Sequence, residues 1–282
     1  MSEQNFDLVD TTLRDGEQTA GVIFSAEDKL RILKVMEETG IRWIEAGIPA
    51  MGGEEQSLLK EMLAMNLNAN LIAWNRAVAE DVKASLECGF SFIHVSVPIS
   101  DINIRYKLQK DRNWVLSRLE NTLRLIRSYG ASVLIGAEDA SRADKNFFLK
   151  VAELGYRYGA IRIRYADTVG CLNPFTTKEV FDYLVKRSFL PIEFHGHNDF
   201  GLAAANSLAA YLSGADYVSA TVTGIGERAG NACLEELVLA LDRLYGYDMK
   251  MKAAPMRKLT RLVEQASGHR IYQYRPAIGR MA

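Results

Sequence analysis

Short apolar segments alternate with longer amphipathic segments along most of the 282-residue chain. The short segments have the length of buried strands, and the longer ones repeat their apolar positions at the spacing of a helix. The pattern predicts strands over residues 6–12, 43–47, 70–74, 92–98, 132–138, 160–166, 191–197 and 217–222. It predicts helices over residues 25–39, 54–66, 78–88, 113–129, 145–155, 176–187, 202–213 and 232–244, and one more over 256–267.

Eight repeats of a strand followed by a helix predict parallel strands joined by crossover helices. This number of units favours a closed (β/α)8 TIM barrel over an open doubly wound sheet. An open sheet would be expected to carry Gly-x-Gly-x-x-Gly after an early strand, whereas the first strand here leads into Thr-Leu-Arg-Asp-Gly-Glu-Gln. We expect a TIM-barrel catalytic domain over residues 1–250 and the start of a linker or subdomain over residues 251–282.

The composition narrows the class of protein. With 34 Lys and Arg against 35 Asp and Glu, the chain has no basic excess, so nucleic acid is not an expected partner. No apolar stretch is long enough for a membrane span, and the polar, acidic start lacks the features of a secretion signal. The three cysteines are far apart, which argues against a disulfide framework and fits a reducing cytoplasm.

The strongest local motif is Glu-Phe-His-Gly-His-Asn-Asp at the end of the seventh predicted strand. Alternation along a strand puts His195 and His197 on one face, where two imidazoles can share a divalent metal. The alternative is a pair of hydrogen-bonded histidines in a polar pocket. The first predicted strand is followed by Arg14 and Asp15. Asp15 can supply a carboxylate ligand, and Arg14 can supply a positive charge for a developing oxyanion. The alternative for this Asp-Gly pair is a surface turn.

Polar residues also end the next strands. Glu138 and Asp139 end the fifth strand as candidates for a general base or for the group that orients one, unless they form a surface salt bridge with Arg142. Thr168 follows the sixth strand as a candidate hydroxyl donor to a substrate carboxylate.

The sixth strand itself carries two arginines on one face. If the face with Arg162 and Arg164 points into the barrel, these charges need partners such as Glu193 or a bound anion. After the eighth strand, a glycine-rich turn that ends in Asn231 lets the backbone approach a ligand closely. A lone histidine such as His94 is more often structural than catalytic.

Three long motifs resemble those of a known family. Asp-Thr-Thr-Leu-Arg-Asp-Gly-Glu-Gln, His-Gly-His-Asn-Asp-Phe-Gly-Leu-Ala and Gly-Ile-Gly-Glu-Arg-Ala-Gly-Asn together resemble the 2-isopropylmalate synthase/homocitrate synthase family of DRE-type TIM-barrel metalloenzymes. Glu-Ala-Gly-Ile-Pro-Ala-Met-Gly, Ala-Trp-Asn-Arg-Ala and Gly-Ala-Glu-Asp-Ala-Ser-Arg look most like the nitrogen-fixation branch of the homocitrate synthases, which makes the organic ligand of the nitrogenase iron–molybdenum cofactor.

The resemblance implies a Claisen-type condensation of acetyl-CoA with a 2-oxo acid, 2-oxoglutarate in the homocitrate branch, followed by thioester hydrolysis. It implies a divalent metal, for which the donors admit Mg²⁺, Mn²⁺ or Zn²⁺. By motif match, the metal would be held by Asp15, His195 and His197, with Asn231 at or near it. Arg14 would stabilise the ketone oxygen, Glu138 would help to deprotonate the acetyl methyl, and the substrate would be lined by Gln18, His94 and Thr168.

Two departures from the family matter. Leu134 stands where lysine-pathway homocitrate synthases carry an arginine for the distal carboxylate of 2-oxoglutarate, and Gly136 replaces a serine; Arg164 or Arg105 are candidate substitutes. The chain also stops at Ile-Gly-Arg-Met-Ala, before a histidine-containing motif of the family. The expectation is a truncated chain or a split enzyme in which a second subunit supplies that segment, and a homodimer is expected from the family.

Other functions remain open at this stage. The same chemistry on another 2-oxo acid would give isopropylmalate or citramalate. A lyase resembling hydroxymethylglutaryl-CoA lyase would run the reverse cleavage, but its cysteine-bearing loop is not evident here. A scaffold subunit without catalysis would have no use for Arg14, Asp15, His195 and His197 together.

Overall fold

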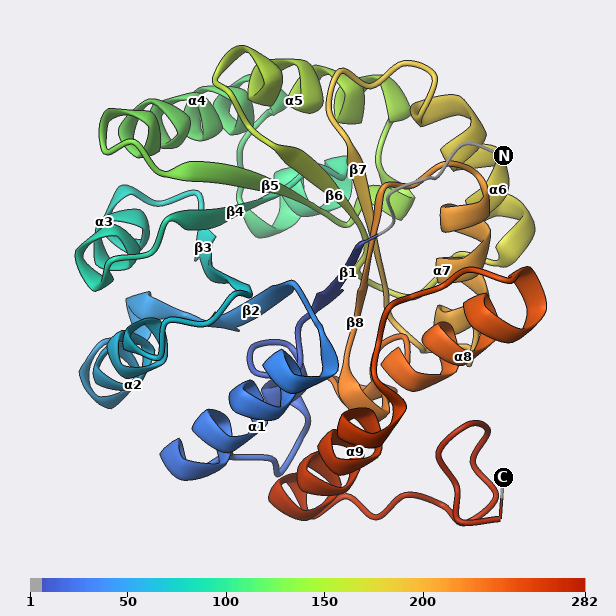
Figure 1. Cartoon of the computed structure of the whole chain (residues 1–282). Helices are drawn as coiled ribbons and strands as arrows, with labels where there is room; N and C mark the ends of the chain where they lie inside the picture. The colour runs from blue at the N-terminus through green and yellow to red at the C-terminus, as the bar shows by residue number, and fades with distance from the viewer. Residues whose placement is uncertain (1–6, 282) are drawn as a thin grey trace.

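Eight parallel strands close into a barrel in the computed structural model, which describes residues 7–281 (Figure 1). The strands are β1 (Asp7–Asp10), β2 (Trp43–Gly47), β3 (Asn70–Arg76), β4 (Phe92–Pro98), β5 (Ser132–Glu138), β6 (Arg162–Asp167), β7 (Ile192–Gly196) and β8 (Tyr217–Ala220). They pair in chain order, and β8 pairs with β1. The predicted TIM barrel is therefore confirmed, while residue 6 of the first predicted strand lies outside the described residues.

A helix follows each strand and packs on the outside of the barrel (Figure 1). The helices are α1 (Ala26–Thr39), α2 (Gly53–Ala64), α3 (Ala79–Cys88), α4 (Arg112–Ser128), α5 (Lys145–Arg157), α6 (Pro174–Leu184), α7 (Ala203–Leu212), α8 (Leu234–Tyr245) and α9 (Ala253–Ser267). Local chemistry sets their ends. Ser25 caps α1 by accepting a hydrogen bond from the Asp28 N–H, and Gly40 ends that helix in the left-handed conformation.

Five of the strands differ from the sequence prediction by one or two residues at a boundary. β1 ends at Asp10 rather than at residue 12, β3 continues to Arg76 rather than ending at residue 74, and β7 spans Ile192–Gly196 rather than residues 191–197. The sixth strand begins at Arg162 rather than at residue 160. The eighth ends at Ala220 rather than at residue 222, because the chain then turns through Val222–Gly224 with Thr223 at a left-handed φ of 59°. This early turn brings the glycine-rich segment directly over the mouth of the barrel.

The barrel interior contains a small apolar cluster as well as charged side chains. Val9, Ile72 and Leu134 form a buried cluster separate from the larger hydrophobic core. Alternation along β6 places Ile163 in that larger core and leaves its two arginines on the opposite face. The arginine face therefore points into the barrel, where its charges meet partners from other strands.

The segment after the eighth unit packs back onto the first one. In Figure 1, α9 lies alongside α1, and the Lys252 N–H donates to the Thr39 carbonyl at 3.1 Å. Leu259 and Val263 of α9 are buried in the larger core. The division at residue 250 stays a prediction.

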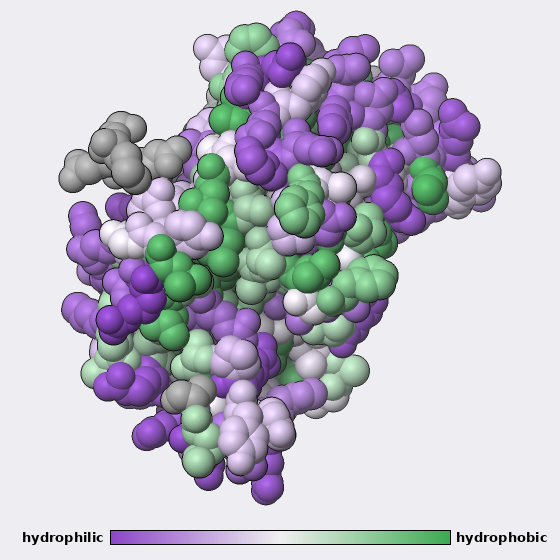
Figure 2. Space-filling view, turned by 90° about the vertical axis from the view of Figure 1, so that its right-hand side faces the viewer, coloured by the Kyte–Doolittle hydropathy of each residue, from purple (hydrophilic) through white to green (hydrophobic). Residues whose placement is uncertain are grey.

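The surface is mixed in polarity. Figure 2 shows hydrophobic residues gathered in a band among hydrophilic ones on the face that carries α6, α7 and α8. Among residues 7–281, no helix combines the length and the apolar character that crossing a membrane requires.

Candidate active site

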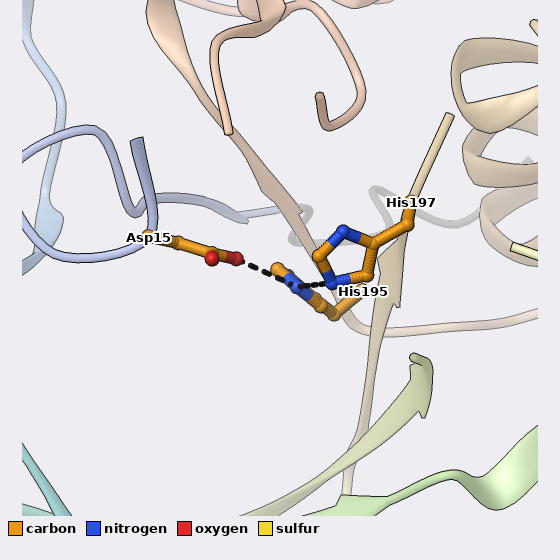
Figure 3. A group of neighbouring side chains, drawn as sticks. All are labelled: Asp15, His195 and His197. Carbon is orange, nitrogen blue, oxygen red and sulfur yellow. Dashed lines mark hydrogen bonds and ion pairs between the residues drawn. The ribbon is translucent and has the colours of Figure 1, made fainter. Parts of the chain in front are cut away.

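Asp15, His195 and His197 converge at the mouth of the barrel. Asp15 lies in the loop after β1, whereas the two histidines lie at the end of β7 and point back toward it (Figure 3). His195 Nε2 lies 3.0 Å from Asp15 Oδ2 and 3.3 Å from His197 Nε2. One ligand atom from each of the three residues lies within 4.8 Å of the others. The Asp-Gly pair is therefore not a surface turn, and residues 180 positions apart form one cluster.

The three side chains fit a divalent metal. All are buried, and His197 Nδ1 has no hydrogen-bond partner among the described residues. Burial alone would raise the pKa of the Asp15 carboxyl, but Arg14, His195 and His197 outweigh it and hold this pKa well below its ordinary range. Burial, followed by the neighbouring His195, lowers the pKa of His197 to about 3. An ionised carboxylate beside a neutral imidazole is the protonation state that a metal site requires.

Asn231 lies next to this cluster. Its backbone forms an isolated antiparallel bridge with His197, and its side-chain Nδ2 donates to the Ile225 carbonyl at 3.0 Å. The buried Oδ1 atom has no hydrogen-bond partner among residues 7–281. A Cβ on Gly226 would stand only 2.1 Å from Asn231 Nδ2, so this turn requires glycine for the asparagine to reach its place.

Arg14 is held beside the cluster by Glu45, a residue to which the sequence analysis assigned no role. Glu45 Oε2 accepts from Arg14 Nε at 2.6 Å, and Arg14 Nη1 lies 3.4 Å from Asp15 Oδ1. Glu45 Oε1 lies 2.8 Å from Arg164 Nη2 and 3.6 Å from His94 Nδ1. The available signal was a carboxylate at the centre of the short, otherwise uncharged strand Trp-Ile-Glu-Ala-Gly.

The two arginines of β6 have the partners that the sequence suggested. Glu193 accepts from Arg162 Nε at 2.7 Å and from Arg164 Nε at 2.5 Å. The Arg162 guanidinium also lies between the rings of Trp43 and Tyr217, 4.5 and 4.4 Å from their centroids. Such contacts stabilise a buried cation. Arg164 is thus engaged by Glu45 and Glu193, and its role as a substrate ligand stays a prediction.

His94 lies below the mouth, next to Gly136. Its side chain is buried, and this burial, together with the charge of Arg164, lowers the pKa of His94 to about 3. A Cβ on Gly136 would come within 2.3 Å of His94 Nε2. The glycine that replaces the family's serine therefore makes room for the His94 ring.

Glu138 and Thr168 lie on neighbouring strand ends of the same rim. Glu138 pairs with Lys107 at 2.8 Å and is partly exposed, so its predicted alternative partner Arg142 is not the one observed. Arg142 instead binds Asp139, which is fully buried. The Thr168 hydroxyl accepts from the Asp139 N–H at 2.8 Å.

The remaining predicted residues are more dispersed. Gln18 ends the short turn Gly16–Gln18, which follows Asp15 in the loop after β1. Its side chain is exposed. Arg105 is exposed on the π-helical turn Asn103–Lys107 after β4. Leu134 belongs to the buried apolar cluster with Val9 and Ile72. The roles of these residues in substrate binding stay predictions.

Comparison with known proteins places this site in a family. The model of the HMGL-like family matches residues 5–263. The chain is 46% identical over 270 residues to homocitrate synthase 1 of Nostoc sp., covering 96% of this chain and 72% of that protein. It is 45% identical over 273 residues to 2-isopropylmalate synthase 2 of Caldanaerobacter subterraneus subsp. tengcongensis, covering 97% and 71%.

A third relative matches most of its own length. The chain is 45% identical over 242 residues to homocitrate synthase subunit alpha of Clostridium pasteurianum, covering 85% of this chain and 89% of that protein. Relatives named for different products thus have nearly equal identity to the chain, and what they share with it is the barrel. The resemblance found in the motifs is confirmed at this level: the chain belongs to the HMGL-like family.

Proposed function

We propose that the chain is the catalytic barrel of an acyltransferase that condenses acetyl-CoA with a 2-oxo acid, and that the preferred oxo acid is 2-oxoglutarate, which gives homocitrate. The observation that carries the proposal is the convergence of Asp15, His195 and His197 beside the buried Arg14–Glu45 pair. The names of the homocitrate synthases among the relatives support the choice of reaction.

In this proposal Asp15, His195 and His197 hold a divalent metal, with Asn231 beside it. When bound there, the metal supplies a Lewis acid for the carbonyl group of the 2-oxo acid. The Arg14 guanidinium adds a fixed positive charge at the same place, where it stabilises the negative charge that develops on the ketone oxygen. Glu45 fixes the orientation of the Arg14 side chain, because its carboxylate binds the Nε and Nη2 atoms of the guanidinium.

Glu138 is the proposed base. It removes a proton from the acetyl methyl group, and the methyl carbon then forms a bond with the ketone carbon of the oxo acid. The π bond of the ketone breaks as this bond forms, and its oxygen takes up a proton to become the hydroxyl group of the product. Water next cleaves the thioester and releases CoA. The methyl proton is very weakly acidic, so the base depends on exact placement. The position of Glu138 at the end of β5, where it pairs with Lys107 at 2.8 Å, supports this role.

The choice of 2-oxo acid is tested with the metal-loaded chain, acetyl-CoA and a panel of 2-oxo acids, by following the release of free CoA. We expect the highest kcat/KM with 2-oxoglutarate. A preference for 2-oxoisovalerate or pyruvate would reject homocitrate in favour of isopropylmalate or citramalate, and the apolar Leu134 would then be the observation in favour of that alternative. Glu138→Gln and His195→Asn serve as inactive controls for the release of CoA.

A second polypeptide is part of the proposal. The Clostridium relative carries the words "subunit alpha" in its name, and this supports an enzyme in which the barrel works with a partner subunit, in addition to any homodimer. We expect the purified chain to bind metal and oxo acid but to release CoA slowly until such a partner is added. Full turnover by the chain alone would falsify the proposal of a partner subunit, but it would leave the proposed condensation reaction standing. A place in the synthesis of the nitrogenase cofactor follows only if homocitrate is the product.

A further inference from the structure

Asp139 has an unusual backbone conformation for a buried residue. Its φ and ψ are 60° and 37°, in the left-handed region, and its side chain is completely buried. This region is unfavourable for residues with a Cβ, although aspartate and asparagine tolerate it better than most. Strain of this kind persists where the surroundings enforce it, and it is found preferentially at functional sites.

The side chain of Asp139 joins two loops of the rim. Oδ2 accepts a hydrogen bond from the Ser100 hydroxyl, in the loop after β4. Arg142 donates to the same carboxylate through Nε and Nη2, at 2.8 and 2.7 Å. Ser100 is itself fully buried, so its hydroxyl has a fixed partner rather than solvent.

The loop after β4 connects Ser100 to Glu138. Ser100 Oγ accepts from the N–H of Asn103 at 3.2 Å, and Asn103 begins the π-helical turn Asn103–Lys107. Lys107 ends that turn and binds the Glu138 carboxylate. These contacts form a closed ring. They lead from Asp139 through Ser100 and the π-helical turn to Glu138, the residue that precedes Asp139 in the chain. π-Helical turns are rare and occur frequently at functional sites.

The backbone of Asp139 makes the second connection, to β6. Its N–H donates to the Thr168 hydroxyl oxygen at 2.8 Å. Because the oxygen of Thr168 accepts this bond, its own proton is directed elsewhere and can be donated to a substrate carboxylate. This contact is made by the backbone of residue 139, whose conformation is left-handed, and not by its side chain.

We propose that Asp139 is a positioning residue that places Glu138 through its carboxylate and Thr168 through its backbone N–H. The inference rests on the proposed function, because it assigns those two groups to the reaction. It separates two effects of one residue. Loss of the carboxylate should displace the base and lower kcat, whereas loss of the backbone conformation should displace Thr168 and raise the KM for the 2-oxo acid.

Three variants test the two effects. Asp139→Gly keeps the left-handed conformation without the carboxylate, and we expect kcat to fall about 100-fold, the cost of a small misplacement of a reacting group, with the KM for the oxo acid almost unchanged. Asp139→Ala removes the carboxylate and also disfavours the left-handed conformation, so kcat should fall and the KM for the oxo acid should rise. Asp139→Asn keeps the conformation and an acceptor oxygen for Ser100, and it should restore most of kcat. A purely structural role would lower stability without this separation of kcat from KM.

Hydrogen–deuterium exchange gives a readout that does not need turnover. We expect faster amide exchange over residues 99–108 in Asp139→Gly than in the wild type, and faster exchange over 167–170 only in Asp139→Ala. The matched control is Asn66→Ala, which replaces another left-handed residue after α2 and should change neither region.

Each outcome decides the inference. Unchanged exchange over 99–108 in Asp139→Gly overturns it, as does a Gly variant with wild-type kcat. If the wild type releases no CoA from any 2-oxo acid, with or without a partner subunit, the proposed function fails while the exchange data still accept or reject the positioning role.

Discussion

Replacing Glu45 by glutamine should destabilise the barrel far more than the loss of a surface carboxylate. Glu45 is inaccessible to solvent, and its two oxygens contact Arg14 and Arg164 at 2.6 and 2.8 Å. The glutamine has almost the same shape, so it leaves no cavity. It removes the negative charge that lies between two buried guanidinium groups, and leaves Arg14 with Asp15 and Arg164 with Glu193 as the remaining ion partners.

The magnitude follows from this geometry. Removing one partner of a buried ion pair costs about 3–5 kcal/mol, and the amide oxygen of glutamine keeps a hydrogen bond worth roughly 1 kcal/mol. We therefore expect a loss of about 3 kcal/mol in the free energy of unfolding. With a urea dependence of about 3 kcal/mol per M, this loss shifts the unfolding midpoint by roughly 1 M.

The dependence on pH gives a second check. Burial would raise the pKa of the Glu45 carboxyl, but Arg14 and Arg164 outweigh it and hold this pKa well below its ordinary value of 4.5. A depressed pKa in the folded state means that the ionised form stabilises the fold, fully above about pH 4.5, and that this contribution is lost as the pH falls through the folded-state value. The gap between wild type and Glu45→Gln should therefore be constant near neutral pH and narrow below about pH 4.5.

The assay is urea unfolding followed by circular dichroism, with Glu38→Gln as the control. Glu38 binds Lys258 at 3.0 Å on the surface, and the loss of such a pair costs about 1 kcal/mol or less. Equal midpoints for the two variants would refute the conclusion that the buried charges depend on one another.

Three further predictions concern the rim and its supports. His195→Asn should weaken binding of Mn²⁺ or Zn²⁺, measured by calorimetry, by more than the roughly 10–100-fold that loss of an outer hydrogen-bond partner costs a metal site; unchanged affinity would exclude this residue as a ligand. Arg228→Met should speed amide exchange in the loop after β7, because Arg228 binds Asp199 there at 2.8 and 3.0 Å; unchanged exchange would show that the loop holds without it. Lys29→Met should lower stability by about 3 kcal/mol, since Lys29 is the buried partner of two carboxylates, Glu55 among them; thermal unfolding at the wild-type temperature would contradict this.

The barrel could be predicted from the sequence because the pattern repeats. Each strand and helix is short, locally consistent and followed by a turn, so errors of two residues at a boundary did not change the topology. The convergence of Asp15 with His195 and His197 could be predicted for the same reason, because the carboxyl ends of all strands in a closed barrel meet at one rim.

The supporting residues could not be predicted in the same way. Glu45 is one carboxylate in a buried strand, and its partners Arg14 and Arg164 come from distant parts of the chain. The left-handed conformation of Asp139 depends on contacts with Ser100 and Thr168, which only the folded barrel brings together. A motif identifies candidate residues for the chemistry, whereas the residues that hold these candidates in place depend on tertiary contacts.

The charges inside the barrel limit how a substrate with two carboxylates can bind. Three guanidinium groups, those of Arg14, Arg162 and Arg164, face the three carboxylates of Asp15, Glu45 and Glu193. These arginines are already neutralised, so a second substrate carboxylate would gain little from them and would pull them away from their partners. Burying a carboxylate without a partner is strongly unfavourable. If the proposed preference for 2-oxoglutarate holds, its second carboxylate must therefore be bound at the rim, by an exposed cation that is not paired with a buried carboxylate, or by a residue that a partner chain supplies.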